Sequence, residues 1–109
     1  MKDRIFIKVR DYYELILIKD IIYIEAAGPN TMLYTVNRRL TTSCNLQVLL
    51  TKINRAEIVR IHRSYAVNLN WIIALNLRSL RIKGALKKNV PLPISKKYQK
   101  SVQSKVTVI

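Results

Sequence analysis

The residues best suited to chemistry are concentrated in one segment, residues 60–68, which reads RIHRSYAVN. The apolar, β-branched run before it predicts a strand, and Arg63 follows where that strand should end. Ser64 is suited to cap a following turn, so the Arg63 guanidinium would extend from a loop held at both ends. A guanidinium mounted in this way can read a base. The alternatives are that Arg63 pairs with Glu57 or simply lies in solvent.

The other reactive side chains are isolated from one another. His62 has no second histidine, cysteine or carboxylate beside it, which favours a hydrogen-bonded structural histidine over a ligand or a catalyst. The single cysteine, Cys44, cannot form an internal disulfide. The two glycines, Gly28 and Gly84, do not form a phosphate-binding loop. We therefore expect no enzyme activity, no metal site and no cofactor.

The charge distribution indicates a polyanionic partner. The chain has 20 Lys and Arg residues against 6 Asp and Glu residues, a formal net charge of +14. All six acids precede Ile58, whereas the 11 basic residues from there onward have no acid among them. A solvated surface usually mixes both signs, so this half of the chain predicts a nucleic-acid footprint. Surface lysines kept for solubility are the alternative, and RNA or ribosome binding stays open at this point.

The length and hydropathy place the chain in a broad class. We expect a single domain over residues 1–109, since this length can bury a core without disulfides or metals. The longest apolar stretches, such as residues 71–75, are far shorter than a membrane helix, and the first residues lack a signal-peptide pattern. With one cysteine, these features predict a cytoplasmic location.

Short strands are predicted along most of the chain, so the fold class is mostly β. The strand-like runs are residues 5–9, 13–18, 21–26, 31–36, 39–42, 58–62, 71–77, 80–82 and 90–94. The sequence Gly28-Pro29-Asn30 predicts a turn after the third run. Asn37 and Arg38 predict a tight hairpin connection in which Asn37 takes the left-handed conformation.

Two helices are expected beside these strands. Apolar residues at helical spacing predict one amphipathic helix, with Ser43 or Asn45 as its N-cap: Leu46, Leu49, Leu50 and Ile53. The free amides at its start suit a phosphate, although plain capping explains Ser43 and Asn45 equally well. Ser95 can cap a short C-terminal helix. Lys96 and Lys97 at its start oppose the helix dipole, which a negatively charged partner would compensate.

Four segments together resemble the LytTR family, DNA-binding domains found at the C-terminal end of many bacterial response regulators. Residues 58–68 match the family's "F-x-R-h-H-R-S-h-h-V-N" motif almost fully, and this is the most specific signal. Residues 20–26 resemble its "D-I-hydrophobic-Y-I-E-A" run, residues 93–98 its "P-hydrophobic-S-R-x-Y" motif, and residues 6–8 its opening strand. The resemblance implies an elongated, mostly antiparallel multi-sheet fold of about ten short strands. In that fold, loops rather than a recognition helix enter the major groove.

The resemblance also implies which residues contact DNA. Three loops would do so: residues 29–32, the junction of Arg63 and Ser64, and residues 95–97. Base contacts would come from Thr31, Arg63 and Lys96. Backbone contacts would come from Asn30, Asn45, Ser64 and Lys97, with His62 supporting its loop.

The function implied is sequence-specific binding of double-stranded DNA by the effector domain of a two-component transcription regulator. We expect the DNA to carry paired direct repeats and two copies of the domain to pair on it. A receiver domain, if present, would lie outside this chain. An RNA- or ribosome-binding module is the alternative, and a protein-interaction module is third.

Overall fold

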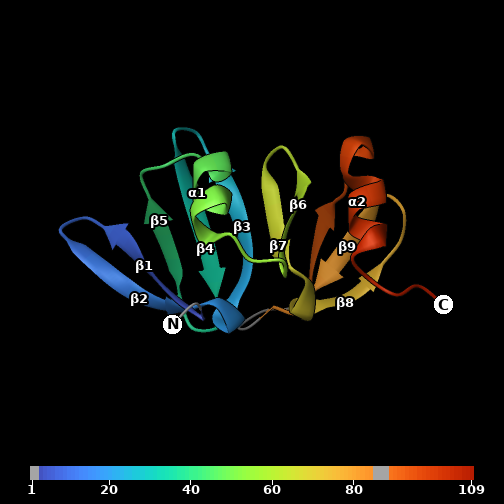
Figure 1. The fold of residues 1–109 in the computed structure, drawn as a ribbon, viewed down its shortest axis with the longest axis horizontal. Helices are drawn as coiled ribbons and strands as arrows, with labels where there is room; N and C mark the ends of the chain where they lie inside the picture. Colours follow the sequence, from blue (N-terminus) through green and yellow to red (C-terminus); the bar gives the residue numbers. More distant parts are fainter. Residues whose placement is uncertain (1–2, 85–88) are drawn as a thin grey trace.

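The computed structural model describes residues 3–84 and 89–109, and within them the fold is mostly β (Figure 1). Ten strands form three antiparallel sheets beside two α-helices, which confirms the predicted fold class. The strands are β1 (Arg4–Val9), β2 (Tyr12–Leu17), β3 (Ile21–Ala27), β4 (Asn30–Thr35), β5 (Arg39–Thr42), β6 (Ile58–His62), β7 (Tyr65–Asn68), β8 (Ile72–Leu75), β9 (Ser79–Ile82) and β10 (Val90–Pro93). The helices are α1 (Leu46–Ile53) and α2 (Gln99–Ser104), with 3₁₀ turns at Ile18–Asp20, Leu69–Trp71 and Lys96–Tyr98.

The three sheets lie side by side along the molecule. The central one has five strands in the order β5-β4-β3-β7-β6, and it lies between the β1-β2 hairpin and the three-stranded sheet β10-β9-β8 (Figure 1). The arrangement is elongated, with extents of 45 × 28 × 26 Å. One end of the molecule carries the β3–β4 turn, the start of α1, the β6–β7 turn and the Ser95–Lys97 segment, along the upper edge in Figure 1. We call it the loop end.

Two hydrophobic cores share the central sheet, one on each face. Neighbouring residues of a strand point to opposite faces, so Ala66 belongs to the first core and Val67 to the second. The first core joins the sheet to the hairpin and α1 through residues such as Ile7, Ile16, Leu46, Leu49 and Ile53. The second joins it to the C-terminal sheet and α2 through residues such as Ile61, Leu80, Ile82, Leu92 and Val102.

Helix α1 agrees closely with its prediction. Leu46, Leu49 and Ile53 are buried, and the Asn45 side-chain oxygen accepts a hydrogen bond from the Val48 N–H at 2.8 Å. Asn45, not Ser43, is therefore the N-cap. The helix ends at Asn54, whose φ of 48° is left-handed and tolerated by asparagine.

Three local expectations were wrong. Strand β7 did not appear in the periodicity, although it pairs with both β3 and β6 in the central sheet. Asn37 is not left-handed; its connection spans three residues and is closed by the Thr35 hydroxyl, which donates to the Arg38 carbonyl at 2.8 Å. Ser95 makes no side-chain cap, since the chain enters α2 through the tighter 3₁₀ turn of Lys96–Tyr98.

No helix in the part of the chain that the structure describes is long and apolar enough to cross a membrane.

Candidate nucleic-acid interface

The β6–β7 turn is fixed by hydrogen bonds to its backbone. The Ser64 N–H donates to His62 Nδ1 at 3.0 Å, and the Ser64 carbonyl accepts the N–H of Ala26 in β3 at 2.8 Å. The His62 ring also lies against Tyr65, with centroids 5.6 Å apart. His62 is thus placed to support the turn through an imidazole nitrogen that is not available to a ligand in this arrangement.

A second arginine ties the same turn to helix α1. The Arg60 guanidinium donates to the carbonyl oxygens of His62, at 3.1 Å, and of Arg63. It also donates to the Gln47 side-chain oxygen in α1 at 3.0 Å. Sequence reasoning assigned Arg60 no role. The sequence gives one clue to such a role: Arg60 lies two residues before His62, in a strand that ends at the turn.

Arg63 itself presents an unpaired charge. Its side chain is exposed and has no hydrogen-bond or ion-pair partner among the described residues. The alternative pairing with Glu57 is wrong, because the Glu57 carboxylate is bound by the Arg55 guanidinium at 2.8 Å. The turn therefore holds the backbone of Arg63 in place and leaves its guanidinium available for an external acceptor.

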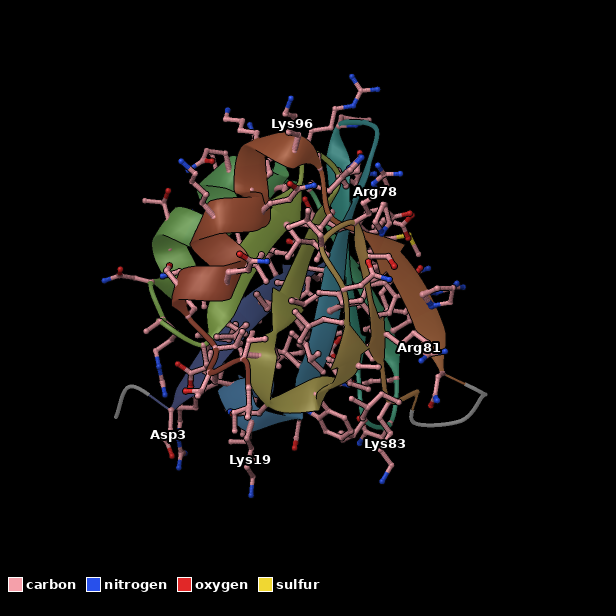
Figure 2. The ribbon with its side chains drawn as sticks, turned by 90° about the vertical axis from the view of Figure 1, so that its right-hand side faces the viewer. Asp3, Lys19, Arg78, Arg81, Lys83 and Lys96 are labelled. Carbon is pink, nitrogen blue, oxygen red and sulfur yellow. The ribbon has the colours of Figure 1, made fainter. Side chains whose placement is uncertain are left out.

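The Ser95–Lys97 segment joins this turn at the loop end. The Ser95 N–H donates to the Ile61 carbonyl at 2.9 Å, and the Ile94 N–H donates to the Arg78 carbonyl at 2.8 Å. Figure 2 shows Lys96 at one end of the molecule with Arg78 on the same side, whereas Asp3, Lys19 and Lys83 lie toward the opposite end. Arg78 is an exposed cation that the motifs did not single out.

The β3–β4 turn corrects one predicted base contact. Thr31 is fully buried, and its hydroxyl donates to the Cys44 carbonyl at 2.6 Å. Strand β4 already begins at Asn30, so Thr31 pairs with Ala26 inside the sheet and faces the first core. A base contact needs an exposed side chain, and we therefore leave Thr31 out of the reading residues. Asn30, at the turn, is partly exposed.

The predicted phosphate contacts keep free donors at the loop end. Asn45 is exposed, and its cap uses the side-chain oxygen, which leaves the side-chain amide hydrogens to donate. Lys97 is exposed, with its Nζ 5.5 Å from the centroid of the Tyr98 ring. The Ser64 backbone is engaged as described above, and its hydroxyl has no hydrogen-bond partner among the residues with described positions.

An acid and three tyrosines form a closed cluster behind the turns. The Tyr34 and Tyr65 hydroxyls donate to the two oxygens of Glu25, at 3.0 and 3.3 Å. The Tyr23 and Tyr34 rings stack with centroids 4.1 Å apart. Burial, followed by the nearby Tyr34 and Glu25, raises the pKa of Tyr23 well above its usual range. The three tyrosines are partly buried, and Tyr23 and Tyr34 stack on each other, so they offer less free ring surface for stacking bases.

Comparison with known proteins gives a consistent result. Residues 11–107 match the family model described as "LytTr DNA-binding domain". Among solved structures, the fold resembles the LytTr DNA-binding domain of a methyl-accepting/DNA response regulator from Bacillus cereus. That likeness has a TM-score of 0.73 and 21% identity over 96% of this chain and 97% of that one. Comparison with curated protein sequences gives no match.

Proposed function

The chain belongs to the LytTR family of DNA-binding domains, and we propose on that premise that it reads a specific duplex DNA sequence. The family match covers nearly the whole chain and agrees with the resemblance seen in the motifs. The observation that carries the proposal is Arg63, an exposed, unpaired guanidinium on a turn whose backbone is held by Arg60, His62 and β3.

Such a turn suits base reading in the major groove. A guanidinium can donate two parallel hydrogen bonds to guanine O6 and N7, which distinguishes G·C from the other pairs. A lysine at the same place would offer only a point charge. Because the backbone around Arg63 is already ordered, DNA binding needs to order little more than the side chain, and this lowers its entropic cost.

The other loops supply the remaining contacts in this proposal. Lys96 is the second base contact, reaching DNA from the 3₁₀ turn that follows β10, where the preceding Ser95 N–H donates to the Ile61 carbonyl of β6. Asn30, Asn45, Ser64 and Lys97 contact phosphates, which fix the register of the domain on the duplex without reading sequence.

We further propose that the domain is the effector part of a bacterial two-component transcription regulator and acts in the cytoplasm by binding, not catalysis. The similar solved structure is a domain of a response regulator, and the charge of +14 suits a nucleic acid as partner. We expect paired direct repeats as target, with the domain monomeric in solution and two copies meeting only on the DNA. A receiver domain, if present, lies outside this chain. Sedimentation showing a stable dimer without DNA would contradict the expectation that the two copies pair only on DNA.

A competition assay tests the proposal. Genomic fragments selected on the immobilised domain supply a specific duplex, which then competes at fixed salt against random duplex and single-stranded RNA. We expect the specific duplex to win at that salt concentration. In a separate titration of salt, log K for the specific duplex should fall against log salt at a slope of about −4 to −5. RNA that competes as well as the selected duplex would overturn sequence-specific DNA reading in favour of an RNA-binding module.

A further inference from the structure

A polar groove lies beside the loop end, on the hairpin side of the molecule. It has a volume of about 260 Å³ and is lined by Lys8 and Arg10 of the β1-β2 hairpin, Asn30 of the β3–β4 turn, and Thr41, Thr42 and Ser43 at the end of β5. Three segments far apart in the sequence thus meet around one space. Asn30 is itself one of the predicted phosphate contacts, and Ser43 lies two residues before another, Asn45.

The lining has the chemistry of an anion site. It contains two cations and no carboxylate, and the side chains of Lys8 and Arg10 have no partner among the described residues. Thr41 and Ser43 are exposed hydroxyls, and Asn30 adds a side-chain amide. Cationic and hydroxyl donors around one space are the groups that proteins use for phosphate oxygens.

A second groove of the same molecule shows that this composition is not general. It is lined by Leu15, Ile16, Leu17, Asp20, Thr35, Asn37 and Arg38, with a volume of about 140 Å³. Its single cation, Arg38, is already paired with Glu14, and Asp20 lies in the lining. An anion there would meet a carboxylate and no available cation. The groove lined by Lys8 and Arg10 differs in both respects, because it has no carboxylate and its two cations have no partner in the described part of the chain.

We propose that the Lys8–Arg10 groove binds one backbone phosphate of the DNA, flanking the bases read at the loop end. The inference rests on the proposed function and extends its footprint to the hairpin. The reach is adequate, because the 45 Å length of the domain exceeds the ~34 Å repeat of the double helix. Lys8 and Arg10 precede residue 11, where the family match begins, so that match does not cover them.

The test compares two duplexes that share the central site, one with flanks of a full helical turn and one trimmed close to that site. The variant is Lys8→Gln/Arg10→Asn. It removes both charges, and asparagine tolerates the left-handed backbone that Arg10 adopts at φ 57°. The matched control is Lys19→Gln/Lys83→Gln, which removes two charges toward the opposite end of the molecule (Figure 2). Thermal melting of each variant establishes that the domain is folded.

We expect the groove variant to bind the long duplex about tenfold more weakly and its salt slope to flatten by about 1. On the trimmed duplex it should bind as the wild type does. The control should lose the same small amount on both duplexes. An equal loss on both duplexes, or no loss on either, would contradict the proposal that this groove binds a phosphate.

Failure of the groove and failure of sequence reading are distinguishable. The length dependence is measured on random duplexes as well, where no base is read. If the wild type prefers no sequence yet still gains from the flanks through Lys8 and Arg10, the reading proposal fails and the groove holds. If it prefers its selected site but gains nothing from the flanks, the reverse is true.

Discussion

The β3–β4 and β6–β7 turns lie at the same end of one sheet but use their side chains in opposite ways. Next to the first, Thr31 at the start of β4 points inward, and its hydroxyl holds the Cys44 carbonyl of the β5–α1 connection. In the second, Arg60 and His62 hold the backbone, and Arg63 makes no contact within the described residues. A side chain whose polar group is used inside the fold, as that of Thr31 is, cannot also contact a base. Neighbouring residues that fasten the turn leave its tip available to a ligand.

The largest effect on DNA binding should follow from removing the exposed Arg63 side chain of the β6–β7 turn. Arg63→Ala should weaken binding to the selected site by about 1–3 kcal/mol and binding to random duplex much less, with thermal stability unchanged. Fluorescence anisotropy with both duplexes measures this, and Lys100→Ala serves as the control. Equal losses on both duplexes would make Arg63 a phosphate contact. Loss of the fold would make it structural.

The fastening side chain should show the converse pattern. Thr31→Val keeps the shape but leaves the Cys44 carbonyl without its donor, which should lower the free energy of unfolding by about 1–2 kcal/mol. Thr31→Ser retains the hydroxyl and should recover most of that loss. Urea unfolding gives the stabilities. A changed base preference in the folded Thr31→Val variant would break the comparison, since it would restore a reading role to Thr31.

The link from the β6–β7 turn to α1 should have a smaller effect. Gln47→Ala removes one acceptor of the Arg60 guanidinium at an exposed position, so we expect a loss of stability of about 0.5 kcal/mol. Faster dissociation from the selected DNA should accompany it, because the turn is less well ordered before binding. Stopped-flow dissociation measures the rate. A change confined to the association rate would show that Gln47 acts on encounter, not on the order of the turn.

The smallest effect should appear at alkaline pH. It involves Tyr23 in β3, the strand that leads into the β3–β4 turn and pairs with β7. Folding raises the pKa of Tyr23 above its ordinary value of 10.0, chiefly through burial, so the folded state favours the neutral phenol. The resulting stability is present below about pH 10 and is lost as pH rises toward the folded pKa. Thermal melting at about pH 8 and about pH 10.5 should show a smaller decline for Tyr23→Phe than for the wild type. An identical decline in both would exclude Tyr23 as a cause.

Residue pattern predicted α1 and nine of the ten strands among the described residues, β7 being the exception. Helix α1 followed from four apolar residues at helical spacing, and three of them are buried. Strand β7 was missed because it comes directly after Ser64, whose type suggested a turn and cap, and not because it is short: β5 also has four residues and was predicted. Its place in the sheet depends on antiparallel pairing with β3, far away in the sequence, and with β6, just before the turn. The spacing of residues within β7 does not encode either pairing.

The candidate site could also be predicted only where its residues carry a local signal in the sequence. The exposure of Arg63 on a turn was predicted because its type and its place after a strand agree, whereas its base contact stays a prediction. The base contact of Thr31 came from the resemblance alone; Thr31 already lay in the predicted strand 31–36, and the alternation of that strand turns its side chain into the core. The Lys8–Arg10 groove left no signal, because it is formed by three segments that only the fold brings together.

The shared central sheet has a consequence for how the domain unfolds. Each hydrophobic core lacks one wall without that sheet, so neither the hairpin side nor the C-terminal side has a complete core of its own. Losing one core exposes a face of the strands that the other core requires. We therefore expect a single cooperative denaturation, in which backbone amide exchange is slowest in β3 and β7 and both ends of the molecule melt together.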